Sequence, residues 1–191
     1  MEYIEGQTFD NLNFAEAPFT KGEYEYCTFS NCNFSNADLS GGMFTECTFV
    51  DCNLSMAKLV KTAFRKVKFE DCKMLGLHFE DCNEFGLSFS FDDCNLTHAS
   101  FFEVAMEGTH FKNCLLQEVD FTECDLSGGV FDDCNLVGSI FENTNLERAD
   151  LRNAVNFSID PEMNRIKKAK FALPGVLGLL DKYQIEIEDK N

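Results

Sequence analysis

The stretch that decides the fold is "CTFSNCNFSNADLS", residues 27–40, in which a large apolar residue recurs at every fifth position: Phe29, Phe34 and Leu39. An α-helix turns about 100° per residue, so a step of five would scatter these side chains around the helix axis. In a flat strand, a step of five would turn each successive side chain to the opposite face. The chain must therefore bend every few residues, so that each large side chain returns to the inside.

The period of five extends along most of the chain in two registers. Every fifth residue from Phe9 to Phe79 is large and apolar, which makes fifteen positions. The same is true of every fifth residue from Phe91 to Leu151, which makes thirteen. We call these large apolar residues the repeat centres. The position two residues before each centre is mostly occupied by a small residue, such as Cys27. Residues two apart in an extended segment point to the same side, so both positions are expected to face inward.

The cysteines indicate how many five-residue sides make one turn. Most of them are spaced by twenty residues, which is four sides of five: Cys32, Cys52 and Cys72, then Cys94, Cys114 and Cys134. Residues 1–157 are therefore predicted to form an all-β, four-sided solenoid with about seven coils, spaced about 4.8 Å apart. Phe79 and Phe91 are twelve residues apart instead of ten. The two extra residues predict a bulge or short loop from Glu84 to Ser90, and Glu84 takes the place of the repeat centre that follows Cys82.

Residues 158–191 have a different pattern, beginning with a break at Pro161. Pro174 is placed to open a short helix, and the alternation in "YQIEIE", residues 183–188, indicates a short strand. An open solenoid end needs a cover, so this segment is expected to be a C-terminal cap. Its wide apolar surface also favours pairing with the same segment of a second chain to give a homodimer. The residues expected to make that contact are Val176, Leu177, Leu179, Leu180, Tyr183, Ile185 and Ile187.

The net charge of −17 has the wrong sign for direct binding to nucleic acid or to an anionic membrane. The start "MEYIEGQTFD" does not have the pattern of a signal peptide, and no apolar run approaches about 18 residues. A cytoplasmic protein is therefore expected. In that compartment the ten cysteines are expected to be reduced, and stacked thiols one coil apart are too distant for a relaxed disulfide.

Residues that could carry chemistry are few. His78, His98 and His110 are scattered singly, and no nucleophile, base and orienting acid lie together in the sequence. Inward thiols in a packed rod do not offer an open tetrahedral arrangement for a metal, so they are interpreted as packing spacers. No catalytic residue, metal or cofactor is therefore assigned, and the chain is not expected to be an enzyme.

The segments "ADLSG", residues 37–41, and "ADLRN", residues 149–153, resemble the repeat A-D/N-L-x-x of the pentapeptide repeat family. This resemblance implies a right-handed quadrilateral β-helix. Within the family, coils such as "FDDCNLVGSIF", residues 131–141, the mid-rod irregularity and the short tail are most similar to the quinolone-resistance (Qnr-type) proteins. That similarity implies a homodimer joined through the C-terminal segment. The dimer would mimic duplex DNA on a type II topoisomerase, DNA gyrase or topoisomerase IV, and would modulate the enzyme or protect it from quinolones. Strongly protective members carry longer projecting loops. This chain has only the two-residue insertion, which favours binding over rescue.

The acidic residues are the candidate partner-binding surface. Residues that are one coil of about twenty apart are expected to lie above one another. Counting in this way aligns acidic residues in one column, interrupted by Lys112, and a second group is expected on the neighbouring side of the rod. The charge per unit length is comparable to that of duplex DNA, which carries one charge per about 1.7 Å. Two alternatives stay open at this stage: a solvated face that keeps the rod soluble, and a non-enzymatic interaction scaffold unrelated to topoisomerases. The candidate residues are Asp51, Glu70, Asp71, Asp92, Asp93, Asp132 and Asp133 in the column, and Glu103, Asp120, Glu123 and Glu142 beside it.

Overall fold

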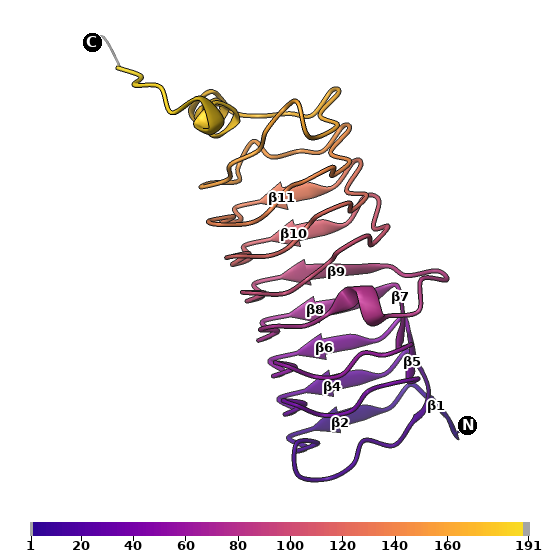
Figure 1. Cartoon of the computed structure of the whole chain (residues 1–191). Helices are drawn as coiled ribbons and strands as arrows, with labels where there is room; N and C mark the ends of the chain where they lie inside the picture. The colour runs from indigo at the N-terminus through magenta and orange to yellow at the C-terminus, as the bar shows by residue number, and fades with distance from the viewer. Residues whose placement is uncertain (1, 189–191) are drawn as a thin grey trace.

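The computed structural model, which describes residues 2–188, is a four-sided parallel β-solenoid with its two ends far apart (Figure 1). One wall is a seven-stranded parallel sheet that contributes one strand to each coil, in the order β11-β10-β9-β8-β6-β4-β2. A second, four-stranded sheet in the order β1-β3-β5-β7 forms part of another wall. The predicted all-β, four-sided solenoid of about seven coils is confirmed.

The strands are short because each wall is only about five residues long. The seven-stranded wall consists of β2 (Thr8–Asp10), β4 (Thr28–Ser30), β6 (Thr48–Val50), β8 (Val67–Glu70), β9 (Phe89–Asp92), β10 (His110–Lys112) and β11 (Val130–Asp132). The four-stranded sheet consists of β1 (Glu2–Glu5), β3 (Gly22–Glu25), β5 (Met43–Thr45) and β7 (Ala63–Arg65). The other walls are joined by single parallel bridges, such as Asn33 to Asn53 and Asp38 to Lys58.

The repeat centres fill the inside of the rod, as the period of five predicts. Phe91, Phe111 and Phe131 stack along one wall, with ring centroids 5.1 and 5.0 Å apart and planes within 9° of parallel. Phe101, from the opposite wall, meets Phe111 edge to face at 6.3 Å and 85°. These stacked and edge-to-face contacts are the geometries that aromatic rings prefer. The core is therefore continuous along the rod, with every coil packed on the next.

The ten cysteines are buried and free. The Cys47 thiol, for example, donates a hydrogen bond to the Tyr24 carbonyl of the preceding coil, with a sulfur to oxygen distance of 3.3 Å. Burial raises the pKa of Cys47 to about 12, so at neutral pH the thiol is protonated and a poor nucleophile. All ten thiols lie on the inside of the rod, as predicted, and their role as packing spacers stays a prediction.

The corners of the coils require an uncommon backbone conformation. The residue two positions after many centres has a positive φ, as in Asn31 (54°), Asp51 (52°), Asp71 (53°) and Asp93 (54°). Asparagine and aspartate tolerate this left-handed region better than most residues. The corner position also faces solvent, so side chains at corresponding corners of successive coils line up along one edge of the rod.

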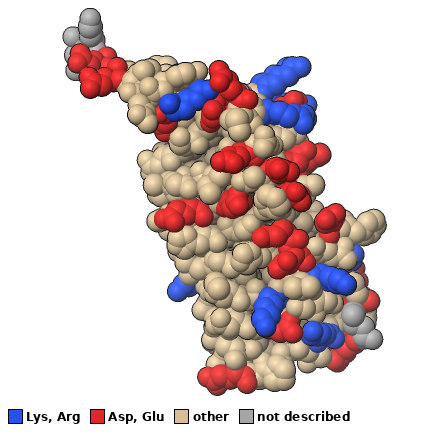
Figure 2. Space-filling model, in the orientation of Figure 1, with Lys and Arg blue, Asp and Glu red and all other residues tan. Residues whose placement is uncertain are grey.

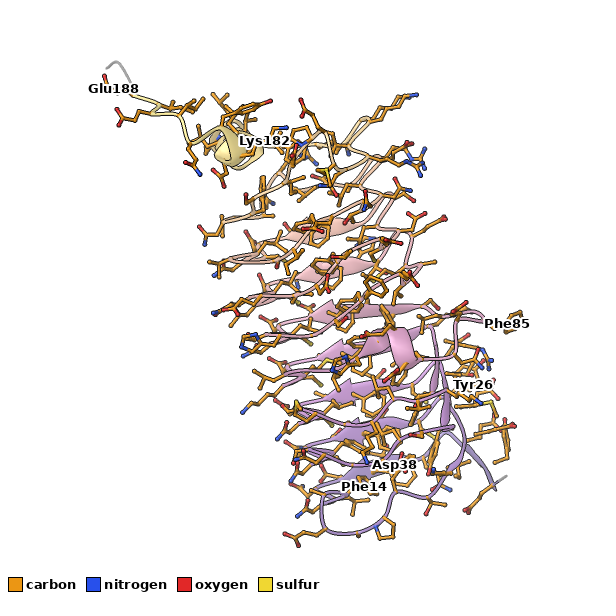
Figure 3. The ribbon with its side chains drawn as sticks, viewed as in Figure 1. Phe14, Tyr26, Asp38, Phe85, Lys182 and Glu188 are labelled. Carbon is orange, nitrogen blue, oxygen red and sulfur yellow. The ribbon has the colours of Figure 1, made fainter. Side chains whose placement is uncertain are left out.

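The mid-rod irregularity is shorter than expected. Residues 83–88 leave the wall, but Ser90 lies within β9 and pairs with Lys68, so the expected loop from Glu84 to Ser90 extended too far. Glu84 is exposed and is not a repeat centre, contrary to the prediction. The 3-10 helix η1 (Phe79–Asp81) precedes this loop. Phe85 at its tip is 81% exposed and projects from the rod (Figure 3).

The C-terminal segment is held on the last coil by several contacts. Coil pairing continues past residue 157, with bridges as far as Asp150 to Lys170. The expected short helix is present as two 3-10 helices, η2 (Leu173–Leu179), which contains Pro174 in its first turn, and η3 (Asp181–Tyr183). Gly178 lies directly against Phe157, where a Cβ atom would collide with the backbone. Lys182 Nζ bonds carboxylate oxygens of Asp160 and Glu162, each at 2.7 Å.

The prediction of a strand over residues 183–188 is wrong. The described part of this segment has no strand, and Gln184 takes a left-handed conformation with φ of 49°. The chain then leads away from the rod (Figure 1). Alternating Ile185 and Ile187 can form a strand only beside a partner strand, and no other described segment of this chain lies in register with them.

Candidate interaction surface

The predicted acidic column forms a corner of the rod, which we call the first acidic edge. Val50, Glu70, Asp92, Lys112 and Asp132 follow one another in register on β6, β8, β9, β10 and β11. The next residue on each coil is the solvent-exposed corner: Asp51, Asp71, Asp93, Asn113 and Asp133.

Neighbouring charges on the first acidic edge affect one another. Partial desolvation, and then repulsion from Asp51 and Asp93, raise the pKa of Asp71 above its usual value. Lys112 interrupts the edge, and its Nζ lies 2.9 Å from Asp92 Oδ2. Asp92 is therefore partly neutralised, whereas Asp93 and Asp133 form no ion pair within residues 2–188.

The second acidic group forms another edge, which we call the second acidic edge. Glu103 and Glu123 occupy its corner, and Asp120 and Glu142 lie on the wall beside it. This wall was expected to neighbour the first, but it lies opposite. The Phe91 and Phe101 rings meet across the core at 6.2 Å and 77°. One coil has four sides, so a step of ten residues from Phe91 to Phe101 crosses two of them. The two acidic edges are therefore diagonally opposite.

The sequence analysis missed further members of the second acidic edge. Glu80 and Asp81 lie in η1, one coil before Glu103, because the insertion shifts the register from twenty residues to twenty-two. Counting back by twenty-two from Glu103 would have identified Asp81. The pairing of His78 with Ser100 shows the same shift in the structure.

The charge is concentrated in the C-terminal half of the rod, residues 80–150, which we call the acidic half. It contains sixteen acidic and two basic side chains, a net charge of −14. The preceding coil is a basic band, residues 58–73. Figure 2 shows red side chains over the upper half of the face that carries η1, with blue ones below them and around the last coil. The basic band consists of Lys58, Lys61, Arg65, Lys66, Lys68 and Lys73, with Glu70 and Asp71.

The expected dimerisation residues divide into two groups in the structure. Leu177, Tyr183, Ile185 and Ile187 are between 50% and 56% exposed. Leu173, 85% exposed, is a further exposed apolar side chain of this segment, which the sequence analysis did not single out. The other group is partly buried and consists of Val176, Leu179 and Leu180, of which Leu179 packs against the core of the rod. Leu177, Ile185 and Ile187, with Leu180, line a groove of about 220 Å³.

Among residues 2–188, no group of three or more His, Cys, Asp or Glu side chains is placed to hold a metal ion. No helix in that range combines the length and apolarity needed to cross a bilayer.

Comparisons with known proteins identify the repeat. The model of the pentapeptide repeat region matches residues 23–90 and 78–151, more than half of the chain. Among proteins of curated function, none matches the sequence. A solved structure of a trypsin-treated variant of QnrB1, a plasmid-mediated fluoroquinolone resistance protein, is similar, with 22% identity and a TM-score of 0.49. The similarity covers 98% of this chain and 100% of that one.

Two other solved structures carry the same type of repeat. HetL from Nostoc sp. strain PCC 7120, involved in heterocyst differentiation regulation, has 15% identity and a TM-score of 0.40, covering 88% of this chain and 84% of its own. A pentapeptide repeat protein from the Arabidopsis thaliana thylakoid lumen has 16% identity and a TM-score of 0.29, and the similarity covers 81% of this chain and 68% of that one. On the match of its repeats over residues 23–151, the chain belongs to the pentapeptide repeat family.

Proposed function

We propose that the protein is a non-enzymatic mimic of duplex DNA that binds a type II topoisomerase, DNA gyrase or topoisomerase IV, through its acidic half. Binding would modulate the enzyme or protect it from quinolones. The observation that carries the proposal is the dense negative charge of the acidic half on a rigid rod. The sequence resemblance to Qnr-type members is the reason for choosing this class of enzyme.

The charge density supports the comparison with DNA. Residues 80–150 make about three and a half coils, or about 17 Å of rod at a coil spacing of about 4.8 Å. A net charge of −14 over this length is one charge per about 1.2 Å, against one per about 1.7 Å for duplex DNA. Residues 2–79 carry a net charge of −4, one per about 5 Å of rod. Only the acidic half therefore reaches the density of DNA.

The two acidic edges also lie where a duplex presents its backbones. They are on diagonally opposite corners of the rod. The faces between them carry the other six acidic side chains of the acidic half: Glu84, Glu107, Glu118, Asp125, Glu147 and Asp150. A basic saddle built to grip two phosphate backbones would meet carboxylates from both sides of such a rod. A rod has no base edges, which suits competition for a surface that binds DNA without reading its sequence.

A homodimer through the C-terminal segment is the second part of the proposal. The apolar surface formed by Leu173, Leu177, Tyr183, Ile185 and Ile187 would be covered by the same surface of a second copy. The acidic half is nearer to this segment than residues 2–79 are, and a last coil with five basic and two acidic side chains, residues 151–171, lies between them. Pairing would therefore place the two acidic halves on either side of the centre of the assembly, which lengthens the DNA-like surface.

The experiment that tests the proposal is a DNA gyrase supercoiling assay with and without a quinolone. We expect the protein to inhibit supercoiling, or to reduce quinolone-stabilised cleavage, and the effect to weaken as salt increases. Absence of any effect or binding on gyrase and topoisomerase IV at low salt would overturn the proposal and favour a scaffold role.

A further inference from the structure

A pocket of about 330 Å³ lies beside the second acidic edge, between the mid-rod loop and the following coil. It exists because residues 83–88 leave the wall. Within the described residues, Ala105 pairs with Asp125 of the next coil but with no residue of the coil before it. This side of the coil is therefore unpaired with the coil that follows, although Asn83 N and Ser88 N still donate hydrogen bonds to the coil before it. The volume is at the lower end of the range of about 300–1,000 Å³ that is typical of ligand pockets.

The lining of the pocket combines carboxylates with apolar surface. Glu80, Glu84 and Glu103 contribute three carboxylates, and no lysine or arginine lines it. Leu87, Phe102 and Val104 are among the apolar lining residues. Such a lining favours a ligand that has a cationic head and an apolar stem.

Glu80 gives an independent indication of a missing partner. Its Oε1 atom lies 2.9 Å from His78 Nδ1, but its Oε2 atom is buried and has no hydrogen-bond partner within the described residues. A buried carboxylate oxygen without a donor is costly, and such atoms in folded proteins nearly always have a partner. The Glu80 side chain as a whole is 27% exposed and lines the pocket, so a donor in the pocket can approach its carboxylate.

We propose that the pocket receives an arginine side chain of the partner protein. A planar guanidinium can donate to more than one carboxylate at once and can lie against an aromatic ring such as Phe102, whereas a lysine ammonium is a compact point charge. The stem of the arginine would pack on Leu87 and Val104. This inference extends the proposed function, on which the identity of the partner rests: a topoisomerase surface that binds DNA is rich in basic side chains.

The test uses the full-length protein and no topoisomerase. N-acetyl-arginine N-methylamide is titrated into the isotope-labelled protein at about 150 mM salt, where diffuse attraction is screened beyond about 8 Å, and amide resonances are followed by NMR. The control ligand is N-acetyl-citrulline N-methylamide, which has nearly the same shape but no charge. We expect shifts concentrated at the pocket residues with a Kd of about 1 mM, and citrulline binding at least about tenfold weaker.

Three variants assign the binding to the pocket. Glu80→Gln removes one carboxylate, and Ala105→Leu fills part of the volume without a change of charge; each is expected to weaken arginine binding about tenfold. Glu16→Gln is the control, because it removes one charge from an exposed position outside the pocket lining and outside the acidic half. It is expected to leave the affinity unchanged. The spectra of the variants away from the pocket report whether the fold is retained.

Three results would overturn the inference: equal binding of arginine and citrulline, shifts spread over both acidic edges, or unchanged affinity in Ala105→Leu. Failure of this inference is distinguishable from failure of the proposed function. A protein that inhibits gyrase but does not bind the arginine amide would refute the pocket alone. A protein that binds the arginine amide in the pocket but has no effect on either topoisomerase would refute the choice of enzyme alone.

Discussion

The position of charge on the rod, and not its total, should decide binding to the topoisomerase. The test variant replaces Asp93, Asp133, Glu103 and Glu123, two corners from each acidic edge, with Asn or Gln. All four side chains are exposed. The matched control replaces Glu2, Glu5, Glu16 and Glu23 of the N-terminal half with Gln. Both variants change the net charge from −17 to −13.

The expected magnitude follows from exposed ion pairs, each worth about 0.5 kcal/mol. Four such pairs with a basic saddle give about 2 kcal/mol, or about a 30-fold loss of affinity. The stability of the test variant should not fall. Its corner residues have φ between 51° and 58°, a conformation that Asn tolerates well, and loss of carboxylates relieves repulsion along each edge.

The assay compares the concentration of each protein that halves gyrase supercoiling, together with thermal unfolding of the same samples. We expect the test variant to need about 30-fold more protein with an unchanged or higher Tm, and the control to behave as the parent. Equal loss in both variants would show that only bulk charge matters and would refute the assignment of the acidic edges.

Three further outcomes are expected. Phe111→Ala, at a fully buried position in the ring stack, should lower the free energy of unfolding by about 3–5 kcal/mol in a denaturant titration; a loss under about 1 kcal/mol would mean that the stack is not tightly packed. The pKa of Asp71 is raised in the folded state, so its favourable contribution is present below about pH 4 and is lost as the pH rises through that pKa. Asp71→Asn should therefore stabilise the protein at pH 7 but not at pH 3, and a gain of equal size at both pH values would contradict this cause. Deletion of residues 172–191 should convert the proposed dimer to a monomer, or cause aggregation, in light-scattering measurements; an unchanged dimer would place the interface elsewhere.

The coil was predictable because a single pattern determines it. Each centre from Phe9 onward faces inward only if the chain turns every five residues, and the twenty-residue spacing of the cysteines then requires four sides. The position of the mid-rod loop was not predictable to the residue. Two extra residues between Phe79 and Phe91 can leave the wall at several places, and hydrogen bonds such as Arg65 Nε to the Phe85 carbonyl, 3.3 Å, occur only in the folded loop.

The candidate surface was predictable in part. The register of the first acidic edge follows from counting by twenty, with one step of twenty-two at the insertion, and the structure has this register. The opposite placement of the second acidic edge was implied by the same counting, since five residues make one side, but it was overlooked. The arginine pocket could not be predicted, because it depends on which wall the loop vacates. The expected strand at residues 183–188 failed because alternation of Ile185 and Ile187 indicates a strand only where a neighbouring strand is present.

Competition with DNA is the most direct test of DNA mimicry. A fluorescently labelled duplex is bound to DNA gyrase at low salt, and its anisotropy is followed as the protein is added. We predict that the protein displaces the duplex at a stoichiometry of one dimer per enzyme, and that added salt weakens this displacement. Binding of the protein to gyrase with the duplex still fully bound would contradict mimicry.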